Sequence, residues 1–126
     1  MFLDETGLLK DNPARLSGGI AVTDLDGNGV FEFLVAGQGG SPHRALKWEG
    51  GRLVDVADPT LASAARPALG FAVADIDGDG REEIYQVGAD GPGSDRLLAG
   101  FGSRWLDLLG QSENAELAGE AGGRVA

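Results

Sequence analysis

The sequence predicts an all-β protein built from two copies of a unit with four short antiparallel strands. Apolar and polar residues alternate with a period near two in segments such as 30–35 and 52–56, which is typical of strands. Glycine-rich turns interrupt these segments at short intervals, and 22 of the 126 residues are glycine. No window has a long amphipathic period of 3.6 residues, so we expect many hairpins and little helix.

Each unit is predicted to contain four strands. They fall at about residues 19–25, 30–37, 44–49 and 52–57 in the first copy, and at about 70–76, 81–88, 95–101 and 104–109 in the second. The copies align at an offset of 51–52 residues, so that Arg44 corresponds to Arg96. An alanine-rich link at 60–68 is the best candidate for a helix, although Pro59 and Pro67 limit it to a turn or two.

Both ends of the chain are out of phase with the repeat. Phe2–Glu5 resembles the last strand of each unit, which predicts a fourth strand without a unit of its own, and 123–126 resemble the first strand of a further unit. We therefore expect one repeat region with four parts: a leading outer strand and linker (1–18), a first unit (19–69), a second unit (70–109), and a linker with the start of a third unit (110–126).

An acidic loop separates the first two strands of each unit. Both loops, 24–32 and 75–83, place oxygen-bearing side chains at positions 1, 3, 5 and 9 and glycine at positions 4 and 6. This spacing gathers hard oxygen ligands around one point, as Ca²⁺ requires, and predicts two calcium sites. The expected ligands are the side chains of Asp24, Asp26, Asn28 and Glu32 with the carbonyl oxygen of Val30, and the side chains of Asp75, Asp77, Asp79 and Glu83 with the carbonyl oxygen of Arg81.

Two other interpretations of these loops are weaker. Asp-Gly and Asn-Gly are common hairpin turns, but the complete pattern occurs twice at the same place in the unit, and clustered carboxylates repel one another without a cation. An EF-hand needs helical flanks and a carboxylate at position 12, where this chain has Val35 and Gln86. We expect weak sites, with Kd of about 10⁻⁴–10⁻³ M, and tighter binding at the second loop, which has one more carboxylate.

Composition excludes several classes of function. Twenty acidic and ten basic residues give a formal net charge of −10, which makes nucleic acid an improbable partner. Cysteine is absent, so no disulfide indicates the compartment. No apolar segment reaches the length of a membrane span, and no signal peptide is visible at the start of the sequence.

The strand and loop at 70–80, Gly-Phe-Ala-Val-Ala-Asp-Ile-Asp-Gly-Asp-Gly, closely resemble the FG-GAP (VCBS-type) repeat. This is the calcium-loop blade of integrin α-subunit heads and of many bacterial surface proteins. Residues 3–6 are similar to segments of the ASPIC/UnbV group. The resemblance covers about 19–109 and implies a β-propeller with four-stranded blades and an extracellular or cell-surface location.

Two blades cannot close a propeller, which usually has four to eight. We expect either that the sequence is part of a longer propeller or that identical chains assemble into a ring, six blades in a trimer and eight in a tetramer. The unmatched strand at Phe2–Glu5 favours assembly, because it could complete a blade of the adjacent chain. Expected partners are therefore further blades or copies of the chain, together with a protein or glycan ligand.

Catalytic residues are scarce. His43, the single histidine, is expected in an exposed hairpin loop without a placed acid partner, and the tryptophans are expected in packing. The leading hypothesis is a non-catalytic, calcium-stabilised propeller scaffold for binding or cell adhesion. One alternative is an enzyme or enzyme-accessory domain with its site in the channel of a complete propeller, and another is a self-assembling structural fragment.

Overall fold

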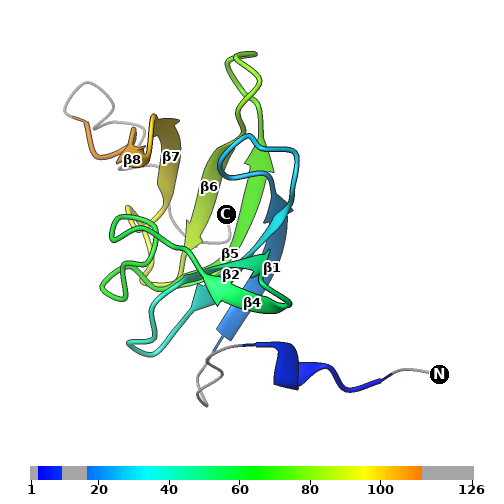
Figure 1. Cartoon of the computed structure of the whole chain (residues 1–126). Coiled ribbons are helices and arrows are strands. Elements are labelled where there is room, and N and C mark those ends of the chain that lie inside the picture. The colour runs from blue at the N-terminus through cyan, green and yellow to red at the C-terminus, as the bar shows by residue number, and fades with distance from the viewer. Residues whose placement is uncertain (1–2, 10–16, 112–126) are drawn as a thin grey trace.

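The computed structural model describes residues 3–9 and 17–111, and these residues confirm the predicted fold class. They form two four-stranded antiparallel sheets in which strands adjacent in sequence are adjacent in space (Figure 1). We call the first sheet blade 1 and the second blade 2. Blade 1 contains β1 (Ser17–Thr23), β2 (Glu32–Gly37), β3 (Arg44–Glu49) and β4 (Arg52–Asp55), and blade 2 contains β5 (Ala68–Ala74), β6 (Glu83–Gly88), β7 (Arg96–Phe101) and β8 (Arg104–Asp107).

The link between the blades is a series of turns rather than a helix. Asp58 opens it: its carbonyl oxygen accepts a hydrogen bond from the Ala62 amide at 2.8 Å, and its Oδ1 accepts one from the Leu61 amide at 2.8 Å. A second hydrogen-bonded turn joins the Arg66 amide to the Ser63 carbonyl oxygen at 3.2 Å, and the two turns stay within the limit expected from the flanking prolines. Leu61 is buried among strands of both blades, so the link closes one end of the core.

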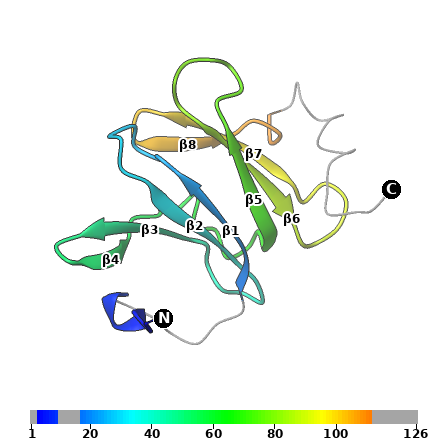
Figure 2. The ribbon, with the colours of Figure 1, turned by 90° about the vertical axis from the view of Figure 1, so that its right-hand side faces the viewer.

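Blade 2 packs against one face of blade 1, and β1 and β5 lie side by side where the blades meet (Figure 2). A Cβ added at Gly18 of β1 would lie 2.7 Å from the carbonyl oxygens of Ala68 and Leu69, so glycine permits this approach. The core between the blades consists of Leu25, Leu34, Ala45, Leu61, Ile84 and Leu98.

The opposite face of blade 1 is apolar and exposed. Val22 and Phe33 are paired in register between β1 and β2 and have exposed fractions of 47% and 43%. Ile20 and Trp48 belong to the same face, with exposed fractions of 64% and 51%. Side chains of this size are normally buried, so the sheet presents a surface suited to further packing.

The described residues near the N-terminus differ from the predicted strand. Leu3, Asp4 and Glu5 belong to no strand, and a 3₁₀ helix, η1 (Thr6–Leu8), follows them. Asp4 Oδ1 accepts hydrogen bonds from the Thr6 amide at 3.0 Å and from Thr6 Oγ1 at 2.5 Å, a local turn that competes with strand formation.

Beyond η1, Leu9 makes an isolated parallel bridge with Leu53 of β4. Phe2 and the segment 123–126 lie outside the described residues. No helix among the described residues is long and apolar enough to cross a membrane.

Candidate metal centres

Loop 1 (residues 24–32) and loop 2 (residues 75–83) connect the first two strands of each blade. Their glycines at positions 4 and 6 all have positive φ: 72° at Gly27, 85° at Gly29, 77° at Gly78 and 90° at Gly80. No other residue type in the described chain has a positive φ, so these backbone bends depend on glycine. The bends turn the acidic side chains of each loop toward its interior.

The first acidic residue of each loop is held by backbone amides of that loop. Asp24 accepts hydrogen bonds from the amides of Asn28 at 3.0 Å and Gly29 at 2.7 Å, one on each carboxylate oxygen. Asp75 likewise accepts hydrogen bonds from the amides of Gly78 at 2.8 Å and Gly80 at 2.9 Å. The charge at position 1 is therefore fixed in the same place in both loops.

The glutamate at position 9 returns to the start of each loop. Glu32 Oε2 accepts a hydrogen bond from the Leu25 amide at 2.8 Å, and Glu83 Oε2 accepts one from the Ile76 amide at 2.7 Å. Both glutamates are buried, with exposed fractions of 1% and 5%. Glu32 Oε1 is buried without a hydrogen-bond partner in the described structure, which leaves one desolvated carboxylate oxygen on this residue.

The structure brings three of the predicted ligands of each loop together. Asp24, Asp26 and Glu32 offer oxygen atoms that all lie within 4.8 Å of one another, and Asp75, Asp77 and Glu83 do the same. These are positions 1, 3 and 9 in both loops. Hard carboxylate oxygens in this arrangement fit Ca²⁺.

The side chains at position 5 make hydrogen bonds within their own loops. Asn28 Oδ1 accepts a hydrogen bond from the Val30 amide at 2.7 Å, and Asp79 Oδ1 accepts one from the Arg81 amide at 2.7 Å. The Asn28 amide group also donates to Asp26 Oδ2 at 3.0 Å. Ligation by these side chains, and by the carbonyl oxygens of Val30 and Arg81, stays a prediction.

A lysine distinguishes loop 1 from loop 2. Lys47 of β3 places its ammonium nitrogen 2.5 Å from Asp26 Oδ2 and 3.7 Å from Glu32 Oε1. The hydrogen bond between Lys47 and Asp26 lowers the pKa of the Asp26 carboxyl and raises the pKa of Lys47. The residue at the matching position of blade 2 is Ala99.

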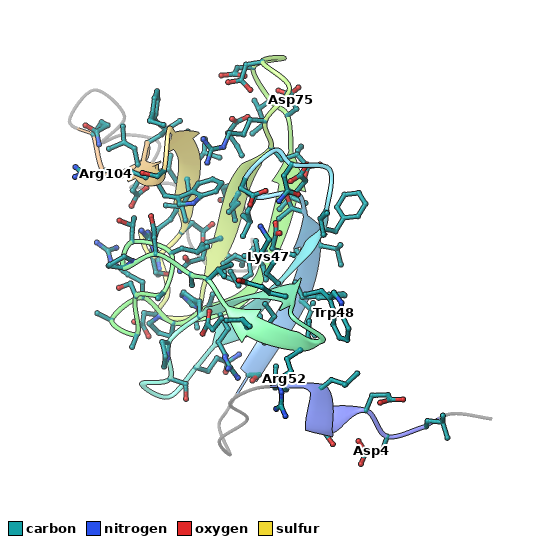
Figure 3. The ribbon with its side chains drawn as sticks, viewed as in Figure 1. Asp4, Lys47, Trp48, Arg52, Asp75 and Arg104 are labelled. Atoms are coloured by element: carbon teal, nitrogen blue, oxygen red, sulfur yellow. The ribbon has the colours of Figure 1, made fainter. Side chains whose placement is uncertain are left out.

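Lys47 was not predicted from the sequence, because it lies on β3 and outside the loop motif that it contacts. Lys47 is two residues from Ala45, a core residue, in β3. Because side chains two apart in a strand lie on the same face, the sequence places Lys47 on the face that carries Glu32. Figure 3 labels Lys47 and its neighbour Trp48, which project to different sides of β3. Comparing Lys47 with Ala99 across the repeat was the signal that could have identified it.

Side chains of blade 2 contact loop 1 and the strand before it. Arg81 Nη2 donates a hydrogen bond to the Leu25 carbonyl oxygen at 3.3 Å, and its guanidinium carbon lies 5.1 Å from the centre of the Trp105 ring. Thr23 Oγ1 donates a hydrogen bond to Glu82 Oε2. The two candidate metal centres are therefore linked by polar contacts across the blade boundary.

The prediction that His43 is exposed was wrong. Its side chain is fully buried, Nδ1 accepts a hydrogen bond from the Gly37 amide at 2.9 Å, and Nε2 lies 2.7 Å from the Arg66 carbonyl oxygen. The ring also meets Phe71 of blade 2 edge to face, with centroids 5.3 Å apart. Nδ1 bonds a backbone amide of blade 1 and Nε2 a backbone carbonyl oxygen of the link, so both nitrogens have structural partners.

Blade 2 uses an aspartate at the place of His43. Asp95 Oδ1 accepts a hydrogen bond from the Gly88 amide at 2.7 Å, as His43 Nδ1 does from Gly37, and Asp95 Oδ2 accepts one from the Tyr85 hydroxyl at 2.5 Å. The repeat thus keeps the amide contact and changes the acceptor.

Comparisons with known proteins agree with this architecture. Residues 24–85 match the family model described as an FG-GAP-like repeat. The chain is 41% identical to cartilage acidic protein 1 of Xenopus tropicalis and 40% identical to the proteins of that name from Homo sapiens and Mus musculus. Each alignment covers 82% of this chain and 18% of the relative, so the chain spans less than a fifth of the length of these proteins.

Proposed function

Residues 24–85 of this chain belong to the FG-GAP-like repeat family, and from that premise we propose that the protein is a calcium-stabilised, non-catalytic propeller module. The observation that carries the proposal is the duplicated cluster of two aspartates and one glutamate in loops 1 and 2. Two independent loops of one chain bring the same three positions together.

Calcium would act here on stability. Each loop gathers at least three carboxylates, and a divalent cation among them relieves the repulsion between like charges. Asp24, Asp26 and Glu32 would hold one ion, and Asp75, Asp77 and Glu83 the other, with the position 5 side chains and the position 7 carbonyl groups as further ligands. A cation that binds the folded state alone stabilises it by mass action.

Thermal unfolding with calcium and with a chelator tests this proposal. At a calcium concentration 100 times Kd, each occupied site should add about 2.7 kcal/mol to the free energy of unfolding. The double variant Asp24→Asn with Asp75→Asn should lose the calcium-dependent rise in Tm. Asp90→Asn removes an exposed turn carboxylate outside both clusters and should keep it. Identical Tm values in calcium and in EGTA would contradict the proposal.

We also propose that the module binds other macromolecules outside the cell rather than catalysing a reaction. The name of the similar proteins, cartilage acidic protein, supports an extracellular setting. The internal hydrogen bonds of His43, the single histidine, support a role without acid–base chemistry. Adhesion to a protein or glycan ligand is the activity that this setting suggests.

The exposed apolar face of blade 1 favours further blades as partners. Ile84 and Leu98 lie on the face that blade 2 presents to blade 1, and Phe33 and Leu46 occupy the matching positions on the opposite face of blade 1, where Phe33 is 43% exposed and Leu46 is buried. The repeat therefore places an unused packing face on blade 1. We propose that a blade from another copy, or from a longer form of the chain, covers it.

A further inference from the structure

We propose that the ammonium group of Lys47 acts as a built-in cation of loop 1 and that calcium must displace it. Loop 2 therefore binds calcium first, and loop 1 binds it second. This inference rests on the proposed calcium function and concerns how the two sites differ. The number of carboxylates already favours loop 2, and Lys47 is a second difference between the loops that favours loop 2.

The position of the ammonium group is the first argument. Lys47 Nζ lies 2.5 Å from Asp26 Oδ2 and 3.7 Å from Glu32 Oε1, and both carboxylates belong to the loop 1 cluster. Its nearest atom in Glu32 is the buried oxygen that has no hydrogen bond. The ammonium therefore stands beside the carboxylates that a divalent cation needs.

Blade 2 provides an internal comparison. Ala99 occupies the place of Lys47, and none of the ion pairs found among the described residues reaches the carboxylates of loop 2. Asp75, Asp77 and Glu83 consequently form a cluster without a neutralising side chain in the described structure. The carboxylates of loop 2 repel one another until calcium binds. In loop 1 the ammonium group of Lys47 already neutralises part of the negative charge.

Calcium and the ammonium group cannot share loop 1 without a cost. Two like charges a few ångströms apart repel strongly near a protein surface, so binding requires the lysine to leave. The structure has room for it: a cavity of about 440 Å³ between the blades is lined by Lys47 and by the acidic residues Glu49 and Asp58. The flexible lysine stem allows the displaced ammonium to move toward these acids.

Isothermal titration with CaCl₂ at fixed ionic strength tests the inference one loop at a time. Asp75→Asn disables loop 2 and leaves loop 1 to be measured. In that background Lys47→Met keeps the length and apolar stem of the side chain and removes its charge, and we expect calcium to bind about tenfold more tightly or better. Lys47→Arg keeps the charge and should leave the affinity within about threefold.

Arg52→Met is the matched control, because it removes one positive charge from an exposed position on the same blade. An equal gain from Arg52→Met and Lys47→Met would show a general effect of net charge and would overturn the inference. If Lys47→Met leaves the calcium affinity of loop 1 unchanged while loop 2 still binds calcium in the Asp24→Asn protein, the inference is overturned and the proposed function stands. No calcium heat in the unsubstituted protein would overturn the proposed function as well.

Discussion

The guanidinium of Arg81 donates a hydrogen bond to the Leu25 carbonyl oxygen at 3.3 Å and thereby joins loop 2 to loop 1 across the blade boundary. The Leu25 amide in turn donates to Glu32, a predicted metal ligand. A single side chain of loop 2 therefore contacts the residue whose amide bonds the glutamate of loop 1.

Replacing Arg81 with Met should lower the free energy of unfolding by about 1–2 kcal/mol, because it removes the hydrogen bonds to Leu25 and Gly102 and the cation–π contact with Trp105. Urea unfolding measures the loss. Arg104→Met removes an exposed arginine from the same blade and should cost less than about 0.5 kcal/mol. Equal losses in the two variants would contradict the assigned role of Arg81.

The two loops should differ in calcium affinity. Asp24→Asn leaves loop 2 intact, and Asp75→Asn leaves loop 1 intact, so titration calorimetry on each variant reports one site. We expect the Asp24→Asn protein to bind more tightly, because loop 2 has an additional carboxylate at Asp79 and no neighbouring lysine. Equal residual affinities would show that neither difference matters.

Tyr85 should ionise late. Its hydroxyl donates a hydrogen bond to Asp95 Oδ2, and this contact with the carboxylate, together with burial, raises the pKa of Tyr85 from its ordinary value of 10.0 to about 12. Because the folded-state pKa is the higher one, the resulting stability is full below about pH 10 and is lost as the pH rises through about 12.

Absorbance at 295 nm follows this ionisation directly, since Tyr85 is the single tyrosine of the chain. Asp95→Asn keeps an acceptor for the Gly88 amide but removes the charge beside the hydroxyl, so its midpoint should move down toward 10. A midpoint near 10 in the unsubstituted protein would show that the hydrogen bond contributes nothing in solution.

Replacing His43 with Leu should destabilise the protein by about 2–3 kcal/mol, because the buried Gly37 amide loses its acceptor. His43→Asn should lose less, since blade 2 satisfies the matching Gly88 amide with a short side-chain oxygen from Asp95. Chemical unfolding of both variants gives the comparison. A larger loss in the asparagine variant would argue against the amide contact as the main contribution of His43.

Phe33→Glu should weaken self-association, because it places a charge in the centre of the exposed apolar face of blade 1. Light scattering as a function of concentration measures the effect. Ser103→Glu adds the same charge at an exposed turn of blade 2, outside the apolar face of blade 1, and should leave the mass unchanged. A monomer at all concentrations before substitution would contradict assembly of this chain with itself.

The order of the strands was predictable from the sequence because it depends on local features. Glycine pairs such as Gly27 with Gly29 require positive φ, and the alternation in 30–35 marks one buried face. The same features gather Asp24, Asp26 and Glu32, whose mutual distances follow from the loop backbone. Residues separated by few positions in the chain were placed well.

Features that depend on distant contacts were not predictable in this way. His43 lies in a connection that looks exposed, yet the Arg66 carbonyl and the Phe71 ring arrive from the link and from blade 2 to bury it. Lys47 reaches a loop that precedes it by about 20 residues, and nothing near Lys47 in the sequence identifies that partner. Near the N-terminus, by contrast, a local turn between Asp4 and Thr6 forms where the sequence resembles a strand.

Blade 1 and blade 2 meet through unlike surfaces, one face of the first against the other face of the second. Contacts of this kind are directional, so every added blade would present to the next one the same surface that its predecessor presented to it. Such a series grows head to tail. It closes when the rotation between neighbouring blades divides a full turn, and it becomes an open helix otherwise. The packing of the core between the blades, to which Leu34 and Ile84 belong, would thereby influence the number of blades in a complete assembly.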